Sequence, residues 1–387
     1  MLTDCYPPRL GGIESQVRDL SRVLVRAGHE VEVFTATAGP DGERRGATVV
    51  SDDGVTVHRL AIPLPGGVPV NPFARHEVRR RVDGGRVDVA HAHLGVVSPF
   101  ATELVPVALD SGLAVTATFH CVIDRSASLF RAVGHLARWA GRGVALNAVS
   151  TMAATRVAAA AGDAQVQVVP NGVDVAWWRE GADPRHDDAA GGGAGGEGTA
   201  SATPSPVHVV SAMRLASRKR PLATLSVLRG ARAILDPAVP MRVTLAGEGP
   251  QRRAMERYLR TRGMDWVELP GRLDREALRR LHQGADVYLT SARLEAFGIG
   301  PLEGRAAGLP VVAPRGTGVD DFVTDGVEGL LAESDVLLAG ALAHLAGDAA
   351  LRRRMRDHNR TVAPSQDWDA VLAATLREYH RAGAPPS

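Results

Sequence analysis

Short apolar runs alternate along the chain with longer segments in which apolar and polar positions recur at helical spacing. Runs that are apolar throughout are typical of strands buried on both faces, as in a parallel sheet covered by helices. In the first half the expected strands are 31–36, 87–91, 114–119, 143–149 and 166–169. In the second half they are 207–213, 241–246, 266–269, 287–290 and 310–313. The pattern therefore predicts an α/β protein with two doubly wound sheets.

The segment 183–206 separates the two series of elements, because it is rich in Gly, Ala, Ser, Thr and Pro and has almost no large apolar side chain. Such a composition cannot build a core, and we expect a disordered linker there. A chain of 387 residues is also longer than one core usually grows. We therefore predict an N-terminal domain over 1–182, completed by a C-terminal helix within 366–387, and a second domain over 207–365.

Composition and charge narrow the class of protein. With 45% hydrophobic and 23% charged residues the chain reads as an ordinary soluble globular protein, and a net charge of +2 is too small to indicate nucleic acid binding. Cys5 and Cys121 form neither a disulfide framework nor a metal-ligand spacing. Charged residues early in the chain are unlike a signal peptide, and no later run suits a transmembrane helix. We expect a cytoplasmic protein without a metal site.

Lys219 is the single lysine among 45 Lys and Arg residues. It lies five residues after Arg214, in a stretch that reads as a buried strand, a loop and a helix. An ammonium is a compact point charge that suits one phosphate oxygen in a tight pocket, whereas a guanidinium favours bidentate partners. Arg214 and Lys219 can thus clamp a diphosphate, although a lysine retained by chance gives the same pattern.

Glycines and polar residues follow several predicted strands, at the edge where open α/β sheets bind ligands. Gly11 and Gly12 precede a helix expected over 15–26, where they allow N–H groups to approach an anion or simply form a turn. His120 ends a strand, and it is either structural or available for chemistry near neutral pH. Asn171 begins an Asn-Gly pair that indicates a tight turn after another strand.

Glu295 and Glu303 stand eight positions apart, with Phe297 and Gly298 between them. One carboxylate can accept hydrogen bonds from two neighbouring hydroxyls, as the acidic residue of dinucleotide-binding folds does for a ribose. Two carboxylates beside a glycine turn can therefore hold two polyols, a ribose and a sugar ring. The alternative is a helix start, where the helix dipole favours a glutamate.

Taken together and in this order, the motifs resemble those of the family 4 retaining glycosyltransferases, which have the GT-B fold. The likeness is carried by GGIE at 11–14, ATFHC at 117–121, VPNGVD at 169–174, the Arg and Lys pair, AGEGP at 246–250 and the two glutamates. It covers nearly the whole chain outside 183–206, and six ordered motifs are more specific than any one. The resemblance implies two facing Rossmann-like domains with a cleft between them. Similar proteins include bacterial glycosyl- and mannosyltransferases, phosphatidylinositol mannosyltransferases among them.

The resemblance also implies an activity, the transfer of a hexose from a nucleoside-diphosphate sugar to an acceptor hydroxyl, with retained anomeric configuration and without a cofactor or metal. The residues that it implies in catalysis are His120, Arg214, Lys219 and Glu295. Those that it implies in donor binding are Gly11, Gly12, Gly247, Arg272, Leu273, Phe297, Gly298 and Glu303. Glu14 and Asn171 are expected on the acceptor side.

Some features depart from the family pattern. The apolar stretch before the first loop is short, so either the start is truncated or the first strand is short. Gly304 and Arg305 follow Glu303 where small apolar helix formers are usual, and the segment 183–206 is longer than the usual connection.

The acceptor is not readable from the sequence, and neither are the donor base and sugar. Arginines gather within 75–86, a basic face that could hold an anionic membrane surface, as a basic helix does in related enzymes, or could simply be solvated. A nucleotide-sugar epimerase or hydrolase on the same architecture is an alternative function. A protein that binds the donor without transfer is another.

Overall fold

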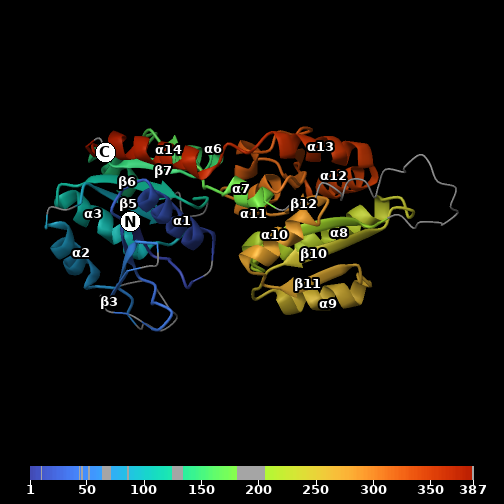
Figure 1. Cartoon of the computed structure of the whole chain (residues 1–387), viewed down its shortest axis with the longest axis horizontal. Coiled ribbons are helices and arrows are strands. Elements are labelled where there is room, and N and C mark those ends of the chain that lie inside the picture. The colour runs from blue at the N-terminus through green and yellow to red at the C-terminus, as the bar shows by residue number, and fades with distance from the viewer. Residues whose placement is uncertain are drawn as a thin grey trace. The chain divides into compact units, whose positions relative to one another are not determined.

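The computed structural model describes residues 1–9, 11–42, 44, 47–50, 53–62, 71–84, 87–123, 134–180 and 205–385. Within these ranges the chain divides into two compact units (Figure 1). The first comprises Met1–Gly172 and Gln366–Ser387, and the second comprises Val173–Ser365. The sequence predicted disorder for 183–206. Residues 183–204 of this segment lie outside the described residues.

The division falls after Gly172, whereas the sequence suggested a boundary at 182. The difference has a physical cause, because helix α7 (Val175–Arg179) packs on the second unit. Its Trp178 is 1% exposed and stacks on His282, with ring centroids 5.1 Å apart. Arg179 donates a hydrogen bond of 2.8 Å to the carbonyl of Asn359.

The first unit is built on an eight-stranded sheet in the order β3-β4-β2-β1-β5-β6-β7-β8. Its strands are β1 (Leu2–Thr3), β2 (Glu32–Thr35), β3 (Ala47–Val50), β4 (Thr56–Arg59), β5 (Val89–Leu94), β6 (Ala114–Phe119), β7 (Ala145–Ala148) and β8 (Gln167–Val168). Among the strands of the described residues, only β3 and β4 pair in antiparallel fashion. The strand order reverses between β1 and β5, which is the point where such sheets bind ligands.

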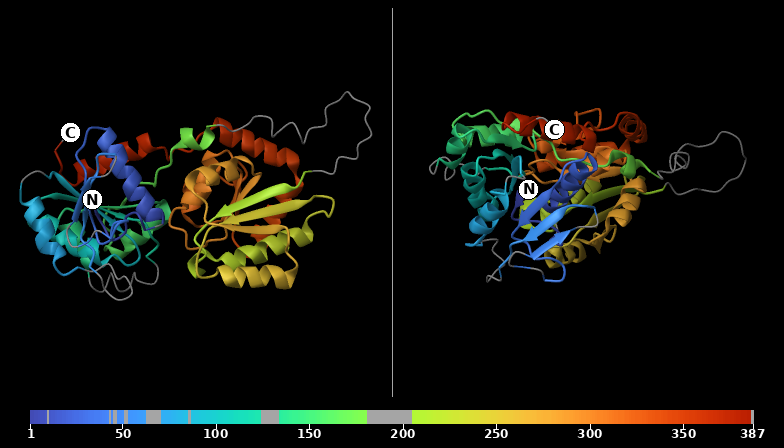
Figure 2. Two further views of the ribbon diagram at one scale, coloured as in Figure 1. Left: turned by 60° about the horizontal axis from the view of Figure 1, so that its bottom comes forward. Right: turned by 60° about the vertical axis from the view of Figure 1, so that its left-hand side comes forward.

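Helices cover both faces of this sheet (Figure 2). They are α1 (Gly12–Arg26), α2 (Ala74–Val82), α3 (Pro99–Asp110), α5 (His135–Gly141), α6 (Thr151–Ala160) and α14 (Trp368–Arg381). One core lies under α2, α3 and α6, and a second joins α1 and α14 to β2 and β4. The last helix thus completes the first unit and lies within the range 366–387 that the sequence suggested.

The second unit is built on a six-stranded parallel sheet in the order β11-β10-β9-β12-β13-β14. Its strands are β9 (Val207–Ala212), β10 (Met241–Ala246), β11 (Val267–Gly271), β12 (Val287–Leu289), β13 (Val311–Pro314) and β14 (Gly329–Ala332). Numbered within the unit this order is 3-2-1-4-5-6, which is that of the dinucleotide-binding fold. The reversal, and with it the expected ligand site, lies between β9 and β12.

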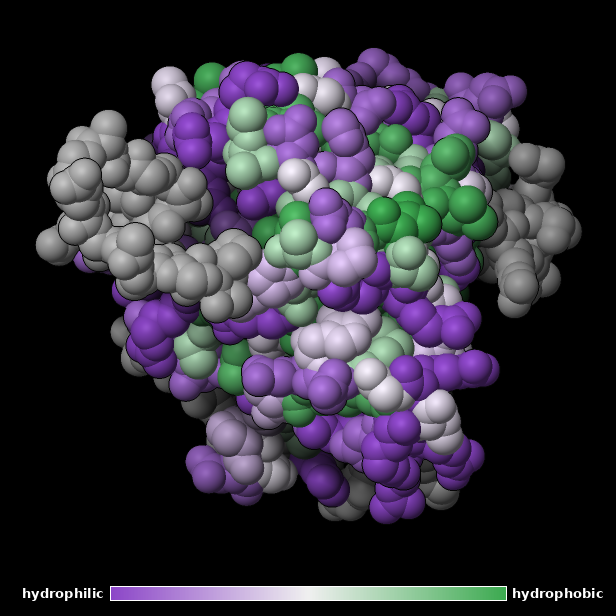
Figure 3. All heavy atoms as spheres, turned by 90° about the vertical axis from the view of Figure 1, so that its right-hand side faces the viewer, coloured by the Kyte–Doolittle hydropathy of each residue, from purple (hydrophilic) through white to green (hydrophobic). Residues whose placement is uncertain are grey.

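The helices of the second unit also lie on both faces of its sheet (Figure 2). They are α7, α8 (Pro221–Ile234), α9 (Arg252–Arg262), α10 (Arg275–Gln283), α11 (Ile299–Ala306), α12 (Asp335–Gly347) and α13 (Ala349–Thr361), with short 3-10 turns η3 (Ser217–Lys219) and η4 (Gly318–Asp321). Helices α8, α9 and α12 share one core of leucine, valine and methionine side chains with the strands. Figure 3 shows one outer face of the molecule, on which polar side chains predominate and apolar ones are scattered among them.

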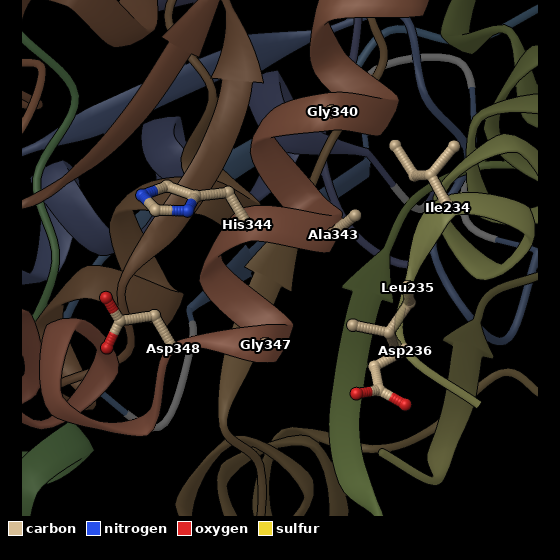
Figure 4. A pocket seen from close by; sticks show the side chains of 8 residues that line it. All are labelled: Ile234, Leu235, Asp236, Gly340, Ala343, His344, Gly347 and Asp348. Atoms are coloured by element: carbon tan, nitrogen blue, oxygen red, sulfur yellow. The ribbon is translucent and has the colours of Figure 1, made fainter. Parts of the chain in front are cut away.

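A cavity of about 480 Å³ lies between the end of α8 and the second half of α12 (Figure 4). Its lining includes Ile234, Ala343 and His344. Since α8 begins at the carboxyl edge of the sheet and ends at the amino edge, this cavity lies at the edge opposite to the expected ligand site. A second cavity, of about 450 Å³, lies at the amino edge of the first sheet, near the starts of β2 and β5.

Candidate active site

Lys219 and Glu295 meet at the switch point of the second sheet. Lys219 ends η3, in the connection that follows β9, and Glu295 lies in the loop that follows β12. The Lys219 ammonium donates a hydrogen bond to the Glu295 carboxylate and forms an ion pair with it. Glu295 is buried and the Lys219 side chain is partly exposed. The structure thus brings together two of the residues predicted to act in catalysis.

The residue after Lys219 holds an unusual backbone conformation. Arg220 has φ 56° and ψ 45°, the left-handed region that a residue with a Cβ adopts only at a cost. Its guanidinium donates to the Ser291 carbonyl at 3.0 Å and to both carboxylate oxygens of Asp335 at 3.1 and 2.7 Å. These contacts anchor the loop that carries Lys219. The sequence did not indicate a role for Arg220 or Asp335, because the left-handed backbone of Arg220 and its pairing with Asp335 appear only in the folded structure.

Gly247 allows the loop after β10 to contact the loop after β9, both at the carboxyl edge of the sheet. A Cβ atom on this residue would lie 1.8 Å from the Met213 carbonyl oxygen, and its φ is 140°. The two loops exchange backbone hydrogen bonds, with Leu215 donating to Glu248 at 2.8 Å. Arg214 lies between Met213 and Leu215 with an exposed side chain. The glycine therefore has a packing role beside Arg214, and its contact with a donor stays a prediction.

Helix α11, which carries Glu303, rests on the ring of Tyr288. A Cβ atom on Gly304 would lie 2.6 Å from Tyr288 Cδ2, and one on Gly300 would lie 2.3 Å from Tyr288 Oη. The Tyr288 hydroxyl also bonds the backbone of Ala212 at the end of β9. Burial raises the pKa of Tyr288, and Glu303 and Glu295 raise it further. Both glutamates therefore lie near one buried ring, and Gly304 stands where no larger residue fits.

Arg305 is buried on the same helix and has a buried partner. Its guanidinium lies 3.2 Å from Glu328, which also accepts a 2.7 Å hydrogen bond from the Thr324 N–H. His358 lies 3.3 Å from the same carboxylate. An arginine at this position, unexpected for the family, is thus matched by a carboxylate that satisfies its charge.

The loop between the two glutamates is tightly supported. Phe297 is buried against Phe322, with ring centroids 5.4 Å apart. Gly298 has φ 101° and is the N-cap residue that directly precedes α11. The N–H of Gly318 donates to the Glu295 carbonyl at 2.9 Å. Arg272 is exposed and Leu273 is half-buried. Both follow β11 directly, so they lie at the carboxyl edge of the sheet, two strands away from β9.

In the first unit the structure brings His120 and Asn171 together. His120 follows β6, and its Nε2 lies 3.0 Å from Nδ1 of His93 on β5. Burial lowers the pKa of His120 to about 4, and a hydrogen bond with the Asn171 side chain partly offsets the effect. Gln16 of α1 bonds both the N–H and the carbonyl of Gly172, at 2.8 and 2.9 Å, and so fixes the turn beside Asn171. His93 and Gln16 were not among the predicted site residues, although alternating histidines on a buried strand were a usable signal.

The start of α1 lies at the carboxyl edge of the first sheet. Gly11 is extended and exposed, and Gly12 begins the helix. Glu14 is buried, and its carboxylate turns back toward Gly11 and lies 3.3 Å from Arg9. A carboxylate in the first turn interacts favourably with the helix dipole. The predicted contacts of Gly11 and Gly12 with phosphates, and of Glu14 with an acceptor, stay predictions.

The basic segment 75–86 forms α2 and the turn after it, as far as it lies within the described residues. Arg80 and Arg81 pair with Glu77 at 2.9 and 2.7 Å. Arg79 lies 3.7 Å from Asp110. Glu77 and Asp110 therefore balance only part of this positive charge, because Arg80 and Arg81 share one carboxylate and Arg142 also pairs with Asp110.

Two general findings concern the described residues. No helix among them has the length and apolar composition needed to cross a bilayer. They also contain no group of three or more His, Cys, Asp or Glu side chains that could hold a metal ion.

Family models match both units of the chain. Residues 10–177 match the model described as Glycosyltransferase Family 4, and residues 204–362 match that of Glycosyl transferases group 1. Among characterised relatives, the D-inositol 3-phosphate glycosyltransferase of Pseudarthrobacter chlorophenolicus is 28% identical, over 96% of this chain and 90% of its own length. The phosphatidyl-myo-inositol mannosyltransferase of Mycolicibacterium smegmatis is also 28% identical, over 95% of this chain and 90% of its own.

Solved structures share the two-unit architecture. HepE from Anabaena, crystallised with UDP and glucose, superposes with a TM-score of 0.71 at 17% identity and covers 96% of this chain and 97% of its own. WaaG, a glycosyltransferase of lipopolysaccharide biosynthesis, superposes with a TM-score of 0.65 at 17% identity and covers 96% of each chain. The fold is therefore the predicted GT-B fold.

Proposed function

The chain belongs to the family 4 glycosyltransferases, and on that premise we propose that it transfers a hexose from a nucleoside-diphosphate sugar to an acceptor hydroxyl with retention of anomeric configuration. In this proposal Arg214 and Lys219 bind the diphosphate without a metal ion. Glu303 accepts hydrogen bonds from the ribose hydroxyls, and Glu295 accepts them from the hydroxyls of the sugar.

The ion pair of Lys219 with Glu295 is the observation that carries the proposal. It holds an ammonium and a carboxylate together between β9 and β12, where doubly wound sheets bind their ligands. An ammonium fixed at that point stabilises the negative charge that develops on the departing diphosphate. The neighbouring Glu295 carboxylate can accept hydrogen bonds from adjacent hydroxyls and therefore favours a polyol as ligand.

The transfer step follows from these roles. The bond between the anomeric carbon and the diphosphate oxygen breaks, and its electron pair leaves with the nucleoside diphosphate. The acceptor oxygen bonds to the same carbon from the same face, and its proton passes to an oxygen of the leaving phosphate. Electrostatic stabilisation of that phosphate by Arg214 and Lys219 is the contribution of the protein.

His120, Gly11 and Gly12 complete the proposal from the first unit. His120 binds the transferred sugar near its reacting carbon, where a neutral imidazole can exchange hydrogen bonds with hydroxyls. The N–H groups at the start of α1 bind phosphate oxygens, as helix N-termini commonly do. Asn171 and Glu14 are assigned to the acceptor.

Relatives guide the choice of substrates to test. HepE is solved with UDP-glucose, and the two relatives named above act on D-inositol 3-phosphate and phosphatidyl-myo-inositol. We take a polyol hydroxyl, in soluble or lipid form, as the acceptor class. For a lipid acceptor, α2 would contact the anionic membrane surface, which sedimentation with phosphatidylinositol vesicles tests directly.

The test is a matrix of UDP-glucose, UDP-N-acetylglucosamine and GDP-mannose against inositol, inositol 3-phosphate and phosphatidylinositol vesicles. We expect one donor to yield a glycosylated acceptor with the anomeric configuration of the donor, in NMR spectra of the product. Chelators should leave the rate unchanged. A product of inverted configuration would overturn the mechanism, and free sugar, an epimerised donor or binding without turnover would indicate one of the other functions.

A further inference from the structure

Three helices of the second unit, α9, α8 and α12, form one continuous outer surface over its sheet. Helix α8 lies between the other two and packs against both. The hydroxyl of Ser226 on α8 lies 3.3 Å from that of Tyr258 on α9. A Cβ atom on Gly230 of α8 would lie 3.2 Å from the Cβ of Ala339 on α12. The surface runs from the carboxyl edge of the sheet, where each of the three helices begins, to the amino edge.

The part of this surface that α9 and α8 form is strongly cationic. The two helices carry seven arginines and one glutamate, whereas the net charge of the whole chain is only +2. Arg253, Arg257 and Arg260 recur at helical spacing on the exposed side of α9, and Arg229 is exposed on the neighbouring α8. Such a concentration of one charge attracts anionic partners.

The four exposed arginines are not used within the fold. Arg252 of α9 pairs with Glu248 and Glu256, at 2.8 and 2.9 Å. Within the part of the chain that the structure describes, the guanidinium groups of the other four form neither an ion pair nor a hydrogen bond. Their charge is therefore available to a partner outside the unit.

The part of the same surface that α12 forms is apolar. Asp335 is the only Asp, Glu, Lys or Arg of this helix, and the next two residues, Val336 and Leu337, are 80% and 57% exposed. Ile234, at the end of α8, is 65% exposed, and the cavity of about 480 Å³ between α8 and α12 lies beside it (Figure 4). Exposed aliphatic side chains next to a cationic surface are typical of helices that lie in the interface of a membrane.

A bilayer suits both parts of the surface, whereas other partners suit only one. Nucleic acid binding without sequence preference uses exposed rings for stacking, but the single ring on α8 and α9, that of Tyr258, is half-buried with Arg262 over it at 5.9 Å. A two-fold contact between copies of the chain would bring this surface of one copy against that of the other, arginines included. An anionic bilayer offers phosphates to guanidinium groups and an apolar layer below them.

We propose that the outer surface of α9, α8 and α12 binds the surface of a bilayer that contains anionic phospholipids. The exposed arginines of α9 and α8 bind lipid phosphates, and Ile234, Val336 and Leu337 insert at the level of the headgroups. The inference is independent of the proposed function, because no donor, acceptor or residue of the candidate active site takes part. It also differs from the contact proposed for α2, which belongs to the first unit and applies only to a lipid acceptor.

Sedimentation of the full chain with vesicles, without any donor, tests the proposal. Vesicles of phosphatidylcholine alone are compared with vesicles in which part of the lipid is phosphatidylserine, whose headgroup has no hydroxyl to accept a sugar. We expect the protein to sediment with the anionic vesicles and not with the neutral ones. Binding should weaken as salt is added, because salt screens the attraction between arginines and lipid phosphates.

Paired substitutions locate the surface that binds. Arg257→Gln with Arg260→Gln should lower the partition coefficient about 25-fold, since each arginine near an anionic surface contributes about fivefold. Arg353→Gln with Arg354→Gln, at exposed positions of α13, is the matched control, because it removes the same charge elsewhere in the same unit. It should bind as the wild type does, with folding of each variant checked by circular dichroism.

A further pair tests the apolar part of the surface. Val336→Ser with Leu337→Ser keeps every arginine and removes the aliphatic side chains that we expect to insert. It should bind anionic vesicles less tightly than the wild type, and the difference should persist at high salt, because screening does not weaken apolar contacts.

Each outcome decides for or against this surface. Weaker binding in the α9 variant with normal binding in the α13 control supports the inference. No sedimentation with anionic vesicles, equal sedimentation with neutral ones, or equal losses in the α9 and α13 variants overturns it. Binding that is lost in Arg79→Gln with Arg80→Gln but kept in the α9 variant also overturns it and places the bilayer on α2. Because the assay contains no donor, its failure leaves the proposed function untouched, and a lack of turnover leaves the vesicle result standing.

Discussion

Lys219 and Glu295 form an ion pair across 76 positions of sequence, one after β9 and the other after β12. The pair fixes the only lysine of the chain at the point where the strand order reverses. Because each member is the counter-charge of the other, removing one leaves a charge without a partner, and the two residues must be tested together.

Lys219→Ala should lower the chemical step by about 100-fold, the scale of losing one group that stabilises transition-state charge. The measurement is single-turnover kinetics with the active donor, with folding checked by circular dichroism. Lys219→Arg should keep part of the activity, since it retains a charge but not the compact shape of an ammonium. Wild-type turnover in a folded Lys219→Ala protein contradicts the assigned role.

A double variant separates catalysis from stability. Lys219→Met alone leaves Glu295 buried without its ion-pair partner, whereas Lys219→Met with Glu295→Gln removes both charges. We expect the double variant to recover melting temperature relative to Lys219→Met but not to recover turnover. Recovery of turnover would mean that the pair serves the fold alone.

Glu303→Gln should weaken the binding of the nucleoside diphosphate, because a hydrogen bond to a charged group contributes about 1.5–3 kcal/mol. This corresponds to roughly a 10- to 100-fold increase in Kd, measured by calorimetric titration with UDP and with GDP. Glu103→Gln, an exposed position on α3, is the control. Equal affinity in Glu303→Gln and the control would remove Glu303 from the ribose site.

Arg220 and Asp335 should affect kcat indirectly, because they hold the loop that carries Lys219. Asp335→Asn weakens the anchor while the left-handed backbone of Arg220 remains, so the loop should relax and kcat should fall several-fold. Arg220→Gly adopts that backbone freely. Added to Asp335→Asn, it should restore part of kcat. No rescue in the double variant would show that the side chain of Arg220, and not its backbone, matters.

Gly304→Ala should destabilise the second unit and displace α11, because the new Cβ would lie 2.6 Å from the Tyr288 ring. Overpacking of this kind typically costs about 1–3 kcal/mol, measured by urea denaturation. Gly340→Ala is the matched control, since a Cβ there meets nothing within 4 Å and lies inside α12. It should stabilise by about 0.5–1 kcal/mol. Equal effects at the two glycines would contradict the packing argument.

Many of the strands follow from the apolar runs, and 114–119 and 241–246 have the predicted bounds. Strand β4 was missed because it buries His58 and Arg59. Their partners, Glu32 at 2.9 Å and the Pro7 carbonyl at 2.6 Å, are distant in sequence. A buried polar strand is stable only with such partners, and local patterns do not contain them.

The candidate site shows the same difference between residues that a local sequence pattern reveals and residues that depend on distant partners. Lys219 and Glu295 were predictable, because each follows a recognisable strand and parallel strands end at one edge. Arg220 and Asp335 were not, since a left-handed backbone and an ion pair across the unit leave no mark in the local sequence. Residues that touch a ligand carry motifs, whereas residues that position them depend on the fold.

His282 makes the stability of the second unit depend on pH. It is fully buried between Trp178 and Tyr288, and neither ring nitrogen has a hydrogen-bond partner among the described residues. Burial lowers its pKa from 6.5 to about 3. The folded state therefore binds fewer protons than the unfolded state below pH 6.5, and stability is lost as the pH falls from there toward 3.

Between pH 7 and pH 5 this one group should remove about 2 kcal/mol from the free energy of unfolding. His282→Leu has no proton to bind and buries no unsatisfied nitrogen, so it should be more stable than the wild type at pH 5 and lose less stability between the two values. Urea denaturation at both pH values measures the difference. His344→Leu, at an exposed position of α12, should leave the pH dependence as it is in the wild type. Parallel pH profiles for the wild type and His282→Leu would mean that His282 finds a hydrogen-bond partner, such as a buried water, in solution.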